Sequence, residues 1–261
     1  MEFKVLGPLE ITMDGQKFGP GAPKVRKVLA LLALRADQMV TVDSLIDEIW
    51  GENPPRTCVT TAQTYIYHLR RFLVKITGSP SAENMIETAP PGYILRVEGD
   101  GVDARRFDEL VAKAQASRAA MRLHDAADQA AAALRLWNGQ PLSNVPCGTL
   151  LRNHATHLEE CRLAATELWV RVNMQLGNHR EMIAELRSLV AHHPYNEWFH
   201  DQLMTALYQA GRRNDALQAY RNVRTLLRDE LGLEPSNALR RLHQEILSAT
   251  PRLATAPLVD A

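Results

Sequence analysis

The pattern of apolar and polar positions in the first hundred residues predicts strands first, then helices, then a hairpin. Residues 2–18 alternate apolar and polar side chains around Gly-Pro and Asp-Gly turns, which is typical of short antiparallel strands. Residues 23–37 instead have the apolar spacing of a helix, with Pro23 near its start. A small sheet is therefore expected before the first helix.

A second, shorter helix is predicted by the segment TVDSLIDEIWG at residues 41–51. Thr41 or Asp43 can cap its start, and Gly51 can end it, because glycine readily adopts the left-handed backbone found just beyond a helix C-terminus. Two prolines then interrupt the chain. The next helix is expected after this break.

A third helix is predicted from about Thr57 to Ile76, and it contains the segment TTAQTYIYHLRRFL at residues 60–73. Its apolar residues recur at steps of three and four, which gathers them on one face for burial. The opposite face carries hydroxyls, one imidazole and basic groups, and it has no carboxylate. The apolar stripe consists of Val59, Ala62, Ile66, Leu69 and Leu73.

The segment MIETAPPGYILRV at residues 85–97 predicts two β segments around a Pro-Pro-Gly turn. The resulting order of sheet, three helices and hairpin is the layout of a winged helix-turn-helix with an N-terminal sheet. We therefore predict a DNA-binding domain over residues 1–97, followed by a short polar junction at residues 98–104.

The second half of the chain is predicted to be an all-α domain over residues 105–250, with a loop of turn residues at 138–148. Gly177 and Gly211 each follow a helix end and precede a new amphipathic helix. Their spacing of 34 residues matches the tetratricopeptide period. Residues 122–137 are interpreted as an earlier, degenerate unit of the same repeat.

The predicted fold class is therefore mainly α with a small β component, a winged helix joined to a tetratricopeptide-like helical repeat domain. A balance of 46% apolar and 23% charged residues over 261 residues suits a soluble globular protein of two domains. Residues 251–261 have no periodicity and are predicted to form a disordered tail.

Net charge is zero, from 30 basic and 30 acidic residues, but the charges are distributed unevenly. Between Gly15 and Ala36 there are five basic residues and no acid, and between Asn53 and Ala82 there are four basic residues and again no acid. A local field of one sign attracts a polyanion such as DNA. A solvated basic face would show the same pattern, so both interpretations stay open at this point.

The polar face of the third helix has the groups that binding in a DNA groove requires. Thr and Tyr hydroxyls and the helix N-terminus suit phosphate oxygens. Gln63 and Thr64 can reach base edges, and Arg71 and Lys75 can neutralise phosphates. An ordinary solvated helix face would interleave Glu and Lys instead. The residues expected to touch DNA on this face are Thr57, Thr60, Thr61, Gln63, Thr64, Tyr67, His68, Arg71 and Lys75.

These segments resemble known families. Residues 41–55 and 60–73 are similar to the second helix and the recognition helix of the OmpR-type winged helix, and residues 89–97, APPGYILRV, are similar to its wing. Residues 215–247, DALQAYRNVRTLLRDELGLEPSNALRRLHQEIL, resemble the signature end of the bacterial transcriptional activation domain. Together, over nearly the whole chain, the two parts resemble the Streptomyces antibiotic regulatory proteins (SARPs).

The resemblance implies a transcriptional activator of a secondary-metabolite (antibiotic) gene cluster. Such a protein would bind direct repeats in double-stranded promoter DNA as a homodimer and would recruit RNA polymerase holoenzyme. The first two helices and the turn after Trp50 would face the polymerase. Since no segment resembles the receiver domain of a two-component regulator, abundance rather than aspartyl phosphorylation is expected to set its activity.

Carried over to this sequence, the resemblance adds Arg70 on the helix and Thr88 and Tyr93 in the wing as expected DNA contacts. Arg70 borders the apolar stripe, so we expect it to reach phosphate from the edge of the helix. The OmpR-type wing commonly has an arginine before Pro-Pro-Gly-Tyr, and here that position is Ala89. The wing is therefore expected to contribute less through charge.

No motif predicts catalysis or a cofactor. The segment GPGAPK at residues 19–24 lacks the spacing of a phosphate-binding loop. His154, His157 and Cys161 share one predicted helix, but a set of this kind without a second ligand pair more often serves packing. Three scattered cysteines do not form a disulfide framework. We therefore expect no enzyme, no cofactor and no metal.

The N-terminus has no secretory signal, and no apolar run is long enough to cross a bilayer. We therefore expect a cytoplasmic, nucleoid-associated protein with no membrane partner. Two alternatives to the activator hypothesis remain. One is an adaptor whose helical repeats bind other proteins, and the other is a regulator whose helical domain senses a pathway metabolite.

Overall fold

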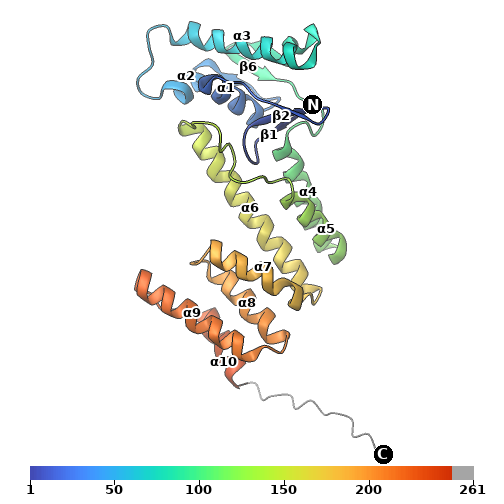
Figure 1. Cartoon of the computed structure of the whole chain (residues 1–261), viewed down its shortest axis with the longest axis vertical. Coiled ribbons are helices and arrows are strands. Elements are labelled where there is room, and N and C mark those ends of the chain that lie inside the picture. The colour runs from blue at the N-terminus through green and yellow to red at the C-terminus, as the bar shows by residue number, and fades with distance from the viewer. Residues whose placement is uncertain (249–261) are drawn as a thin grey trace, which may run out of the picture. The chain divides into compact units, whose positions relative to one another are not determined.

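The computed structural model describes residues 1–248 and is shown in Figure 1. The chain divides into two compact units, of which the first comprises residues 1–169 and the second begins at Val170. The division falls inside helix α6 (Thr149–Gln175). The fold is mainly helical, as predicted, and strands occur only in the first unit among the described residues. The predicted tail at residues 251–261 lies outside them.

The first unit begins with a three-stranded antiparallel sheet in the order β1-β2-β3. Phe3 pairs with Ile11 across the first two strands, and both side chains are fully buried. Asp14 and Gly15 form the turn between β2 and β3 with φ values of 49° and 77°, the positive values that a two-residue hairpin turn needs. The strands are β1 (Glu2–Lys4), β2 (Glu10–Met13) and β3 (Gln16–Phe18).

Three helices and a second antiparallel sheet, in the order β4-β6-β5, complete the winged helix. The Thr41 side chain accepts a hydrogen bond from Ser44 N at 3.1 Å, so Thr41 rather than Asp43 caps the second helix, and Gly51 ends it. The elements are α1 (Pro23–Leu34), β4 (Val40–Thr41), α2 (Val42–Trp50), α3 (Cys58–Thr77), the 3₁₀ helix η1 (Pro80–Met85), β5 (Ile86–Ala89) and β6 (Gly92–Leu95).

The apolar stripe of α3 is buried at its last four positions, as predicted, whereas Val59 is 47% exposed. The preceding residues 51–57 are all exposed, so they do not cover the first turn of the helix. The prediction that Val59 joins the core is therefore wrong. The buried stripe begins at Ala62, and the first turn of α3 lies at the surface.

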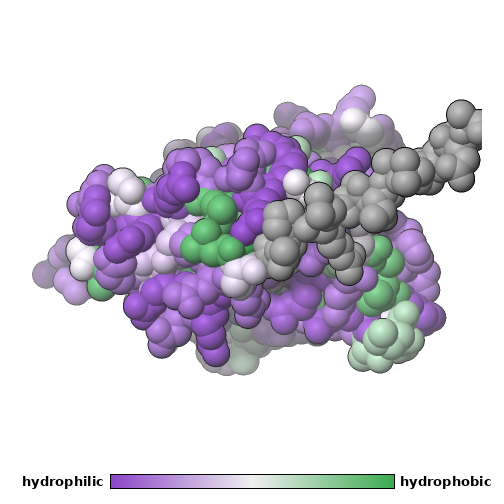
Figure 2. All heavy atoms as spheres, turned by 90° about the horizontal axis from the view of Figure 1, so that it is seen from below, coloured by the Kyte–Doolittle hydropathy of each residue, from purple (hydrophilic) through white to green (hydrophobic). Residues whose placement is uncertain are grey.

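The helices that follow pack against their neighbours in the sequence. In the first unit α4 packs along α5, and in the second unit α7 packs on α8, α8 on α9, and α10 on both α8 and α9 (Figure 1). Figure 2 shows one face of the molecule, where the described residues are mostly hydrophilic with small hydrophobic areas. The helices are α4 (Asp103–Ala119), α5 (Leu123–Leu134), α7 (His179–His192), α8 (Glu197–Gln209), α9 (Arg213–Leu231) and α10 (Asn237–Ser248).

Residues from the helical half of the chain contribute to the core of the winged helix. The segment between α5 and α6 contains no helix or strand, and it runs back along the N-terminal sheet. There the amides of Asn138 and Leu142 donate to Leu6 O at 2.8 Å and Gly7 O at 2.7 Å. The first unit therefore extends well past the predicted junction. The side chains that this half adds to the core include Leu142, Val145 and Leu151.

The 34-residue repeat corresponds to two similar turns between helices. Gly177 and Gly211 have φ values of 81° and 79°. In each turn the next amide donates to the carbonyl oxygen five residues earlier, at 3.1 and 2.8 Å. The turn before α5 has the same hydrogen bond at 2.9 Å, but Met121 occupies the glycine position with φ of 58°. The unit interpreted as degenerate therefore begins after the same kind of turn.

We expect Gly211→Ala to lower the free energy of unfolding by about 1 kcal/mol. A Cβ at this positive φ strains the backbone, although no atom lies within 4 Å of it. Urea unfolding followed by circular dichroism measures the change. Gly21→Ala is the matched control, because Gly21 has the same open surroundings without the positive φ. An equal loss from both substitutions would contradict the strain argument.

Candidate nucleic-acid interface

The outward face of α3 presents polar side chains to solvent. Thr57 occupies the N-cap position, and Thr61 is half-buried at the edge of the face. α3 contains no Asp or Glu. The fold therefore gathers the helix residues predicted to touch DNA on one acid-free helix. Those that are exposed are Thr57, Thr60, Gln63, Thr64, Tyr67, His68, Arg71 and Lys75.

Two of the predicted hydroxyl groups are already engaged within the helix. The Thr61 and Thr64 hydroxyls donate to the carbonyl oxygens of Thr57 and Thr60 at 2.8 and 2.9 Å. A hydroxyl has one proton, so it cannot donate to a phosphate oxygen while it makes this bond. In these rotamers the two threonines are better suited to base donors or to a thymine methyl group than to phosphate.

Arg70 joins α3 to the hairpin formed by β5 and β6. Its Nε and Nη2 donate to Ile86 O at 3.0 and 2.6 Å, and Nη2 also donates to Thr88 Oγ1 at 2.8 Å. The guanidinium lies 6.0 Å from the centre of the Tyr93 ring. Tyr93 is only 7% exposed, so its side chain belongs to the core and does not present the DNA contact that the sequence suggested. Arg70 is likewise engaged with the wing instead of being free for phosphate.

Arg71 and Lys75 are the cations of α3 that remain available to an anion. Within residues 1–248, neither side chain has an ion pair or a hydrogen bond. Tyr67 and His68, on the same face, contact each other with ring centres 5.8 Å apart. A cation without an internal partner can bind phosphate without first breaking a contact. The positive charge that α3 offers to DNA is therefore that of Arg71 and Lys75.

A groove of about 440 Å³ lies between α3 and the wing, and it contains carboxylates that the helix lacks. Glu83 from η1 and Glu87 from β5 line it opposite residues of α3. Glu87 pairs with Arg96 at 2.7 Å. The sequence analysis missed these acids because they follow the helix in the chain, and only the folding of η1 and β5 places them beside it.

The basic cluster between Gly15 and Ala36 is largely engaged in internal contacts. Lys17 pairs with Glu10 at 3.0 Å, and Arg26 and Lys27 donate to backbone carbonyl oxygens at 2.6 and 2.9 Å. These contacts fix three of the five basic side chains within the fold, so the cluster is not simply a solvated basic face. These three side chains would have to leave an internal partner to contact DNA directly.

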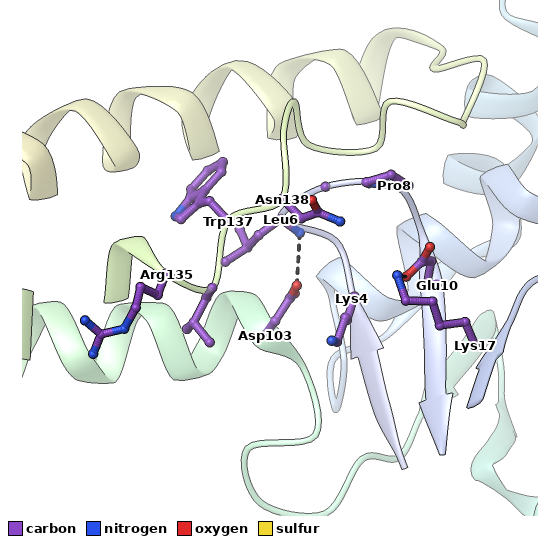
Figure 3. A pocket seen from close by; sticks show the side chains of 11 residues that line it. Lys4, Leu6, Pro8, Glu10, Lys17, Asp103, Arg135, Trp137 and Asn138 are labelled. Carbon is purple, nitrogen blue, oxygen red and sulfur yellow. Dashed lines mark hydrogen bonds and ion pairs between the residues drawn. The ribbon is translucent and has the colours of Figure 1, made fainter. Parts of the chain in front are cut away.

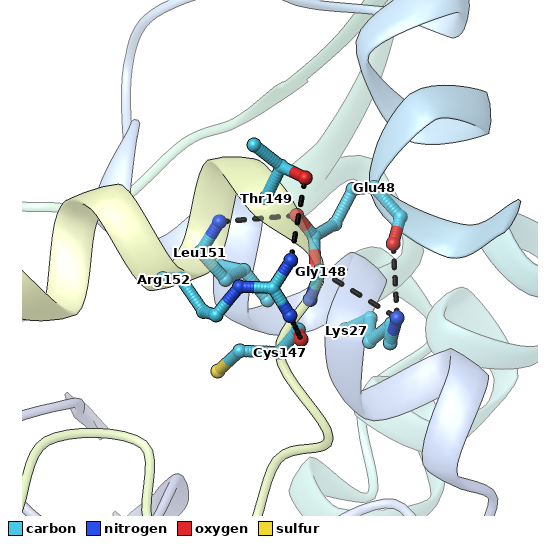
Figure 4. Close-up of polar contacts among 7 residues, drawn as sticks. All are labelled: Lys27, Glu48, Cys147, Gly148, Thr149, Leu151 and Arg152. Carbon is cyan, nitrogen blue, oxygen red and sulfur yellow. Dashed lines mark hydrogen bonds and ion pairs between the residues drawn. The ribbon is translucent and has the colours of Figure 1, made fainter. Parts of the chain in front are cut away.

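A buried carboxylate fixes α2, the helix before α3, to the start of α6 (Figure 4). Glu48 is 1% exposed, and its oxygens accept hydrogen bonds from the amides of Gly148 and Leu151, the latter at 3.0 Å. The first amides of a helix have no partner within the helix, so the carboxylate satisfies them and complements the helix dipole. A Cβ on Gly148 would overlap Glu48. No local sequence pattern marks this contact, because its partners are 100 residues apart.

A second buried carboxylate, Asp103 at the start of α4, holds the N-terminal sheet (Figure 3). It is 2% exposed, and its oxygens accept hydrogen bonds from Val5 N at 2.8 Å and Leu6 N at 3.1 Å. Burial raises the pKa of Asp103 to about 6, although the hydrogen bonds from these amides oppose the rise. The carboxylate borders a cavity of about 280 Å³ that Lys4 and Arg135 also line.

Two family models match the chain. Transcriptional regulatory protein, C terminal, matches residues 17–95, and Bacterial transcriptional activator domain matches residues 102–247. The chain is also 36% identical over 254 residues to the regulatory protein DnrI of Streptomyces peucetius, covering 96% of this chain and 93% of DnrI. The chain belongs to the SARP family of transcriptional regulators.

Other relatives of this SARP protein are longer than it is. Regulatory protein AfsR of Streptomyces griseus is 36% identical over 97% of this chain but only 25% of AfsR. The solved structure of Mycobacterium tuberculosis EmbR, in complex with a low-affinity phosphopeptide, matches with a TM-score of 0.86 and 36% identity. That match covers 94% of this chain and 64% of the EmbR chain. The OmpR-type and helical domains are thus shared, and the matched region spans a quarter of AfsR and about two thirds of the EmbR chain.

Membership of the SARP family also answers the question of catalysis, since the family consists of transcriptional regulators and not of enzymes. Residues 1–248 contain no helix that is both long and apolar enough to cross a membrane. Over the same residues, no group of three or more His, Cys, Asp or Glu side chains is arranged to hold a metal ion. His157 and Cys161 do approach each other, at 3.6 Å.

Glu48→Ala should lower the free energy of unfolding of this SARP protein by roughly 2–4 kcal/mol, because it leaves the amides of Gly148 and Leu151 without their buried acceptor. Glu48→Gln should cost less, since its amide oxygen can still accept one of the bonds. Thermal unfolding of the three proteins measures the difference. Glu52→Ala, at an exposed position in the next turn, is the control. Equal effects at positions 48 and 52 would refute the capping role.

Asp103 should make stability depend on pH. Its pKa in the folded protein, about 6, exceeds the ordinary value of 3.8, so the folded state binds the proton more tightly. The stabilising contribution is therefore complete below pH 4 and is lost as pH rises through 6. The stability difference between the wild type and Asp103→Asn should fall by up to about 3 kcal/mol between pH 4 and 7.

Urea unfolding at a series of pH values measures this difference, and Asp100→Asn, at an exposed position nearby, is the control. Subtracting the variant from the wild type removes the contributions of other titrating groups. A difference that stays constant across the range would mean that folding leaves the pKa of Asp103 unchanged.

Proposed function

We propose that this SARP protein activates transcription by placing α3 in the major groove of promoter DNA that contains direct repeats. Membership of the family supports a role in transcription, and the proposal adds how the DNA is read. The observation that carries it is the outward face of α3, a 20-residue helix without carboxylates. On this face the side chains of Arg71 and Lys75 make no ion pair or hydrogen bond within residues 1–248. A polyanion is the partner that such a face fits.

The side chains on this face divide into base contacts and backbone contacts. Gln63 can pair with adenine through its amide, and Thr64 can pack against a thymine methyl group. Arg71 can bind guanine or phosphate. Thr88 accepts a hydrogen bond from Arg70, so its own proton is free for a phosphate oxygen. The proposed DNA contacts are Thr57, Thr60, Thr61, Gln63, Thr64, Tyr67, His68, Arg71, Lys75 and Thr88.

The target we propose is a direct repeat at the promoter of a secondary-metabolite gene cluster. Direct repeats require two copies of the protein in head-to-tail order, which is a heterologous contact that must stop at two. RNA polymerase holoenzyme would then meet the surface of α1 and α2 and the turn at residues 51–57, which is exposed throughout. Such a protein acts on the chromosome, so we place it at the nucleoid.

Binding to the promoter beside its own gene tests this function. Fluorescence anisotropy would compare the natural fragment with one whose repeats are scrambled, across a salt series. Tight binding that scrambling abolishes is the expected result, and the slope of log affinity against log salt counts the phosphates engaged. Binding that ignores scrambling would leave only a basic surface, and no binding at all would favour the protein adaptor.

Arg71→Ala should weaken binding to the repeat fragment about tenfold and reduce the salt slope by about one, because it removes a cation that contacts base or phosphate. Thermal unfolding should be unchanged, since the exposed Arg71 side chain makes no ion pair or hydrogen bond with the described residues. Arg187→Ala removes the same charge from an exposed position of α7 and serves as the control. Equal affinity of Arg71→Ala and wild type would show that α3 does not read the DNA.

A further inference from the structure

We propose that Glu83 limits the affinity of this protein for DNA, because its carboxylate lies where a backbone phosphate passes between α3 and the wing. The weakened affinity makes occupancy of a site depend on two copies bound together at the direct repeat. This inference rests on the proposed function. To the residues that favour DNA binding it adds one residue, Glu83, that opposes DNA binding.

The position of Glu83 follows from the packing of η1. This short helix packs against α3, and it places Glu83 and Asn84 along the groove of about 440 Å³ that Tyr67 and Arg71 line from the other side. β5 closes the groove with Thr88. Glu83 is exposed and lines the groove, so its side chain is accessible to a ligand there.

The charges around the groove leave Glu83 uncompensated. Arg70 is bound to Ile86 O and Thr88 Oγ1, and Glu87 is neutralised by Arg96 at 2.7 Å. Within residues 1–248, the Glu83 carboxylate has no ion pair and no hydrogen bond, although the backbone carbonyl of Glu83 accepts a hydrogen bond from Ile86 N. Of the described residues that line the groove, Arg71 and Glu83 are therefore the two whose charged groups have no partner.

The inference adds to the binding mode proposed above that the hairpin reaches the minor groove next to α3, which brings a phosphate to this groove. When a helix occupies the major groove and the adjacent hairpin reaches the minor groove, the backbone that separates the two grooves runs between helix and hairpin. Arg71, Asn84 and Thr88 would attract its phosphates, and Glu83 would repel them. The repulsion acts on any DNA sequence, because it is exerted on the backbone.

If Glu83 weakens binding to all DNA sequences equally, single half-sites lose more occupancy than paired repeats do. If each copy binds more weakly, an isolated half-site is seldom occupied at a given protein concentration. Two copies on adjacent half-sites gain from their mutual contact and remain bound. Glu83 therefore favours paired repeats over the many single half-sites and random sequences of a genome.

Glu83→Gln tests the inference, since it keeps the shape of the side chain and removes its charge. Anisotropy with the full chain would measure affinity for the paired repeat, for one half-site and for scrambled DNA at several salt concentrations. We expect roughly threefold to tenfold tighter binding to the half-site and to scrambled DNA. The salt slope should steepen by up to about 0.9, as one more positive charge is left to meet phosphate.

Glu98→Gln is the matched control, because it removes the same charge from an exposed position outside the groove lining. Thermal unfolding of both variants should equal that of the wild type. If wild type binds the repeat and Glu83→Gln binds half-site and scrambled DNA no more tightly than Glu98→Gln does, the inference is wrong while the proposed function stands. If wild type does not distinguish the repeat from scrambled DNA, both fail together.

Discussion

The carboxylate of Glu48 at the N-terminus of α6 is the interaction on which the arrangement of the first unit depends. It joins the helix before α3 to a long helix from the other half of the chain, and Lys27 and Gly148 complete the contact. Asp103 makes a similar connection between α4 and the N-terminal sheet. The winged helix is thus held at two places by buried carboxylates that accept hydrogen bonds from backbone amides. Through α2, the Glu48 contact also fixes the support on which α3 packs.

The basic residues of the winged helix divide into those that build the fold and those that remain free. Arg26, Lys27 and Arg70 all donate to backbone oxygens, and the contacts of Arg70 hold the wing against α3. Arg71, the neighbour of Arg70 in the sequence, has no such contact among the described residues. Two consecutive residues of α3 therefore differ in role, because Arg70 holds the wing and the guanidinium of Arg71 is available to a ligand. Charge counts along the chain cannot make this distinction, because it depends on which carbonyl oxygens lie within reach.

Local patterns in the sequence predicted the elements well and the tertiary contacts poorly. The apolar spacing of α3, the Thr41 cap and the glycine turns at Gly177 and Gly211 are each determined by a few neighbouring residues, and all are present. The exposure of Val59, the burial of Tyr93 and the carboxylates beside α3 depend on segments distant in the chain. Most of the helix residues expected to touch DNA are exposed on α3, and their contact with DNA stays a prediction. The domain boundary predicted at residues 98–104 also stays a prediction. The first compact unit continues past it to residue 169.

Leu142, Val145 and Leu151 belong to the core of the winged helix, so residues 1–97 do not contain the whole of that core. A chimera that joined residues 1–97 to the helical half of a relative would bring together side chains that had not been fitted to one another. Cavities or clashes would then appear in the core beneath α3. Substitutions on the exposed surface of α3 leave this core unchanged, whereas exchange of residues 1–97 disturbs it. The smallest piece that can be transplanted with its packing intact extends into α6.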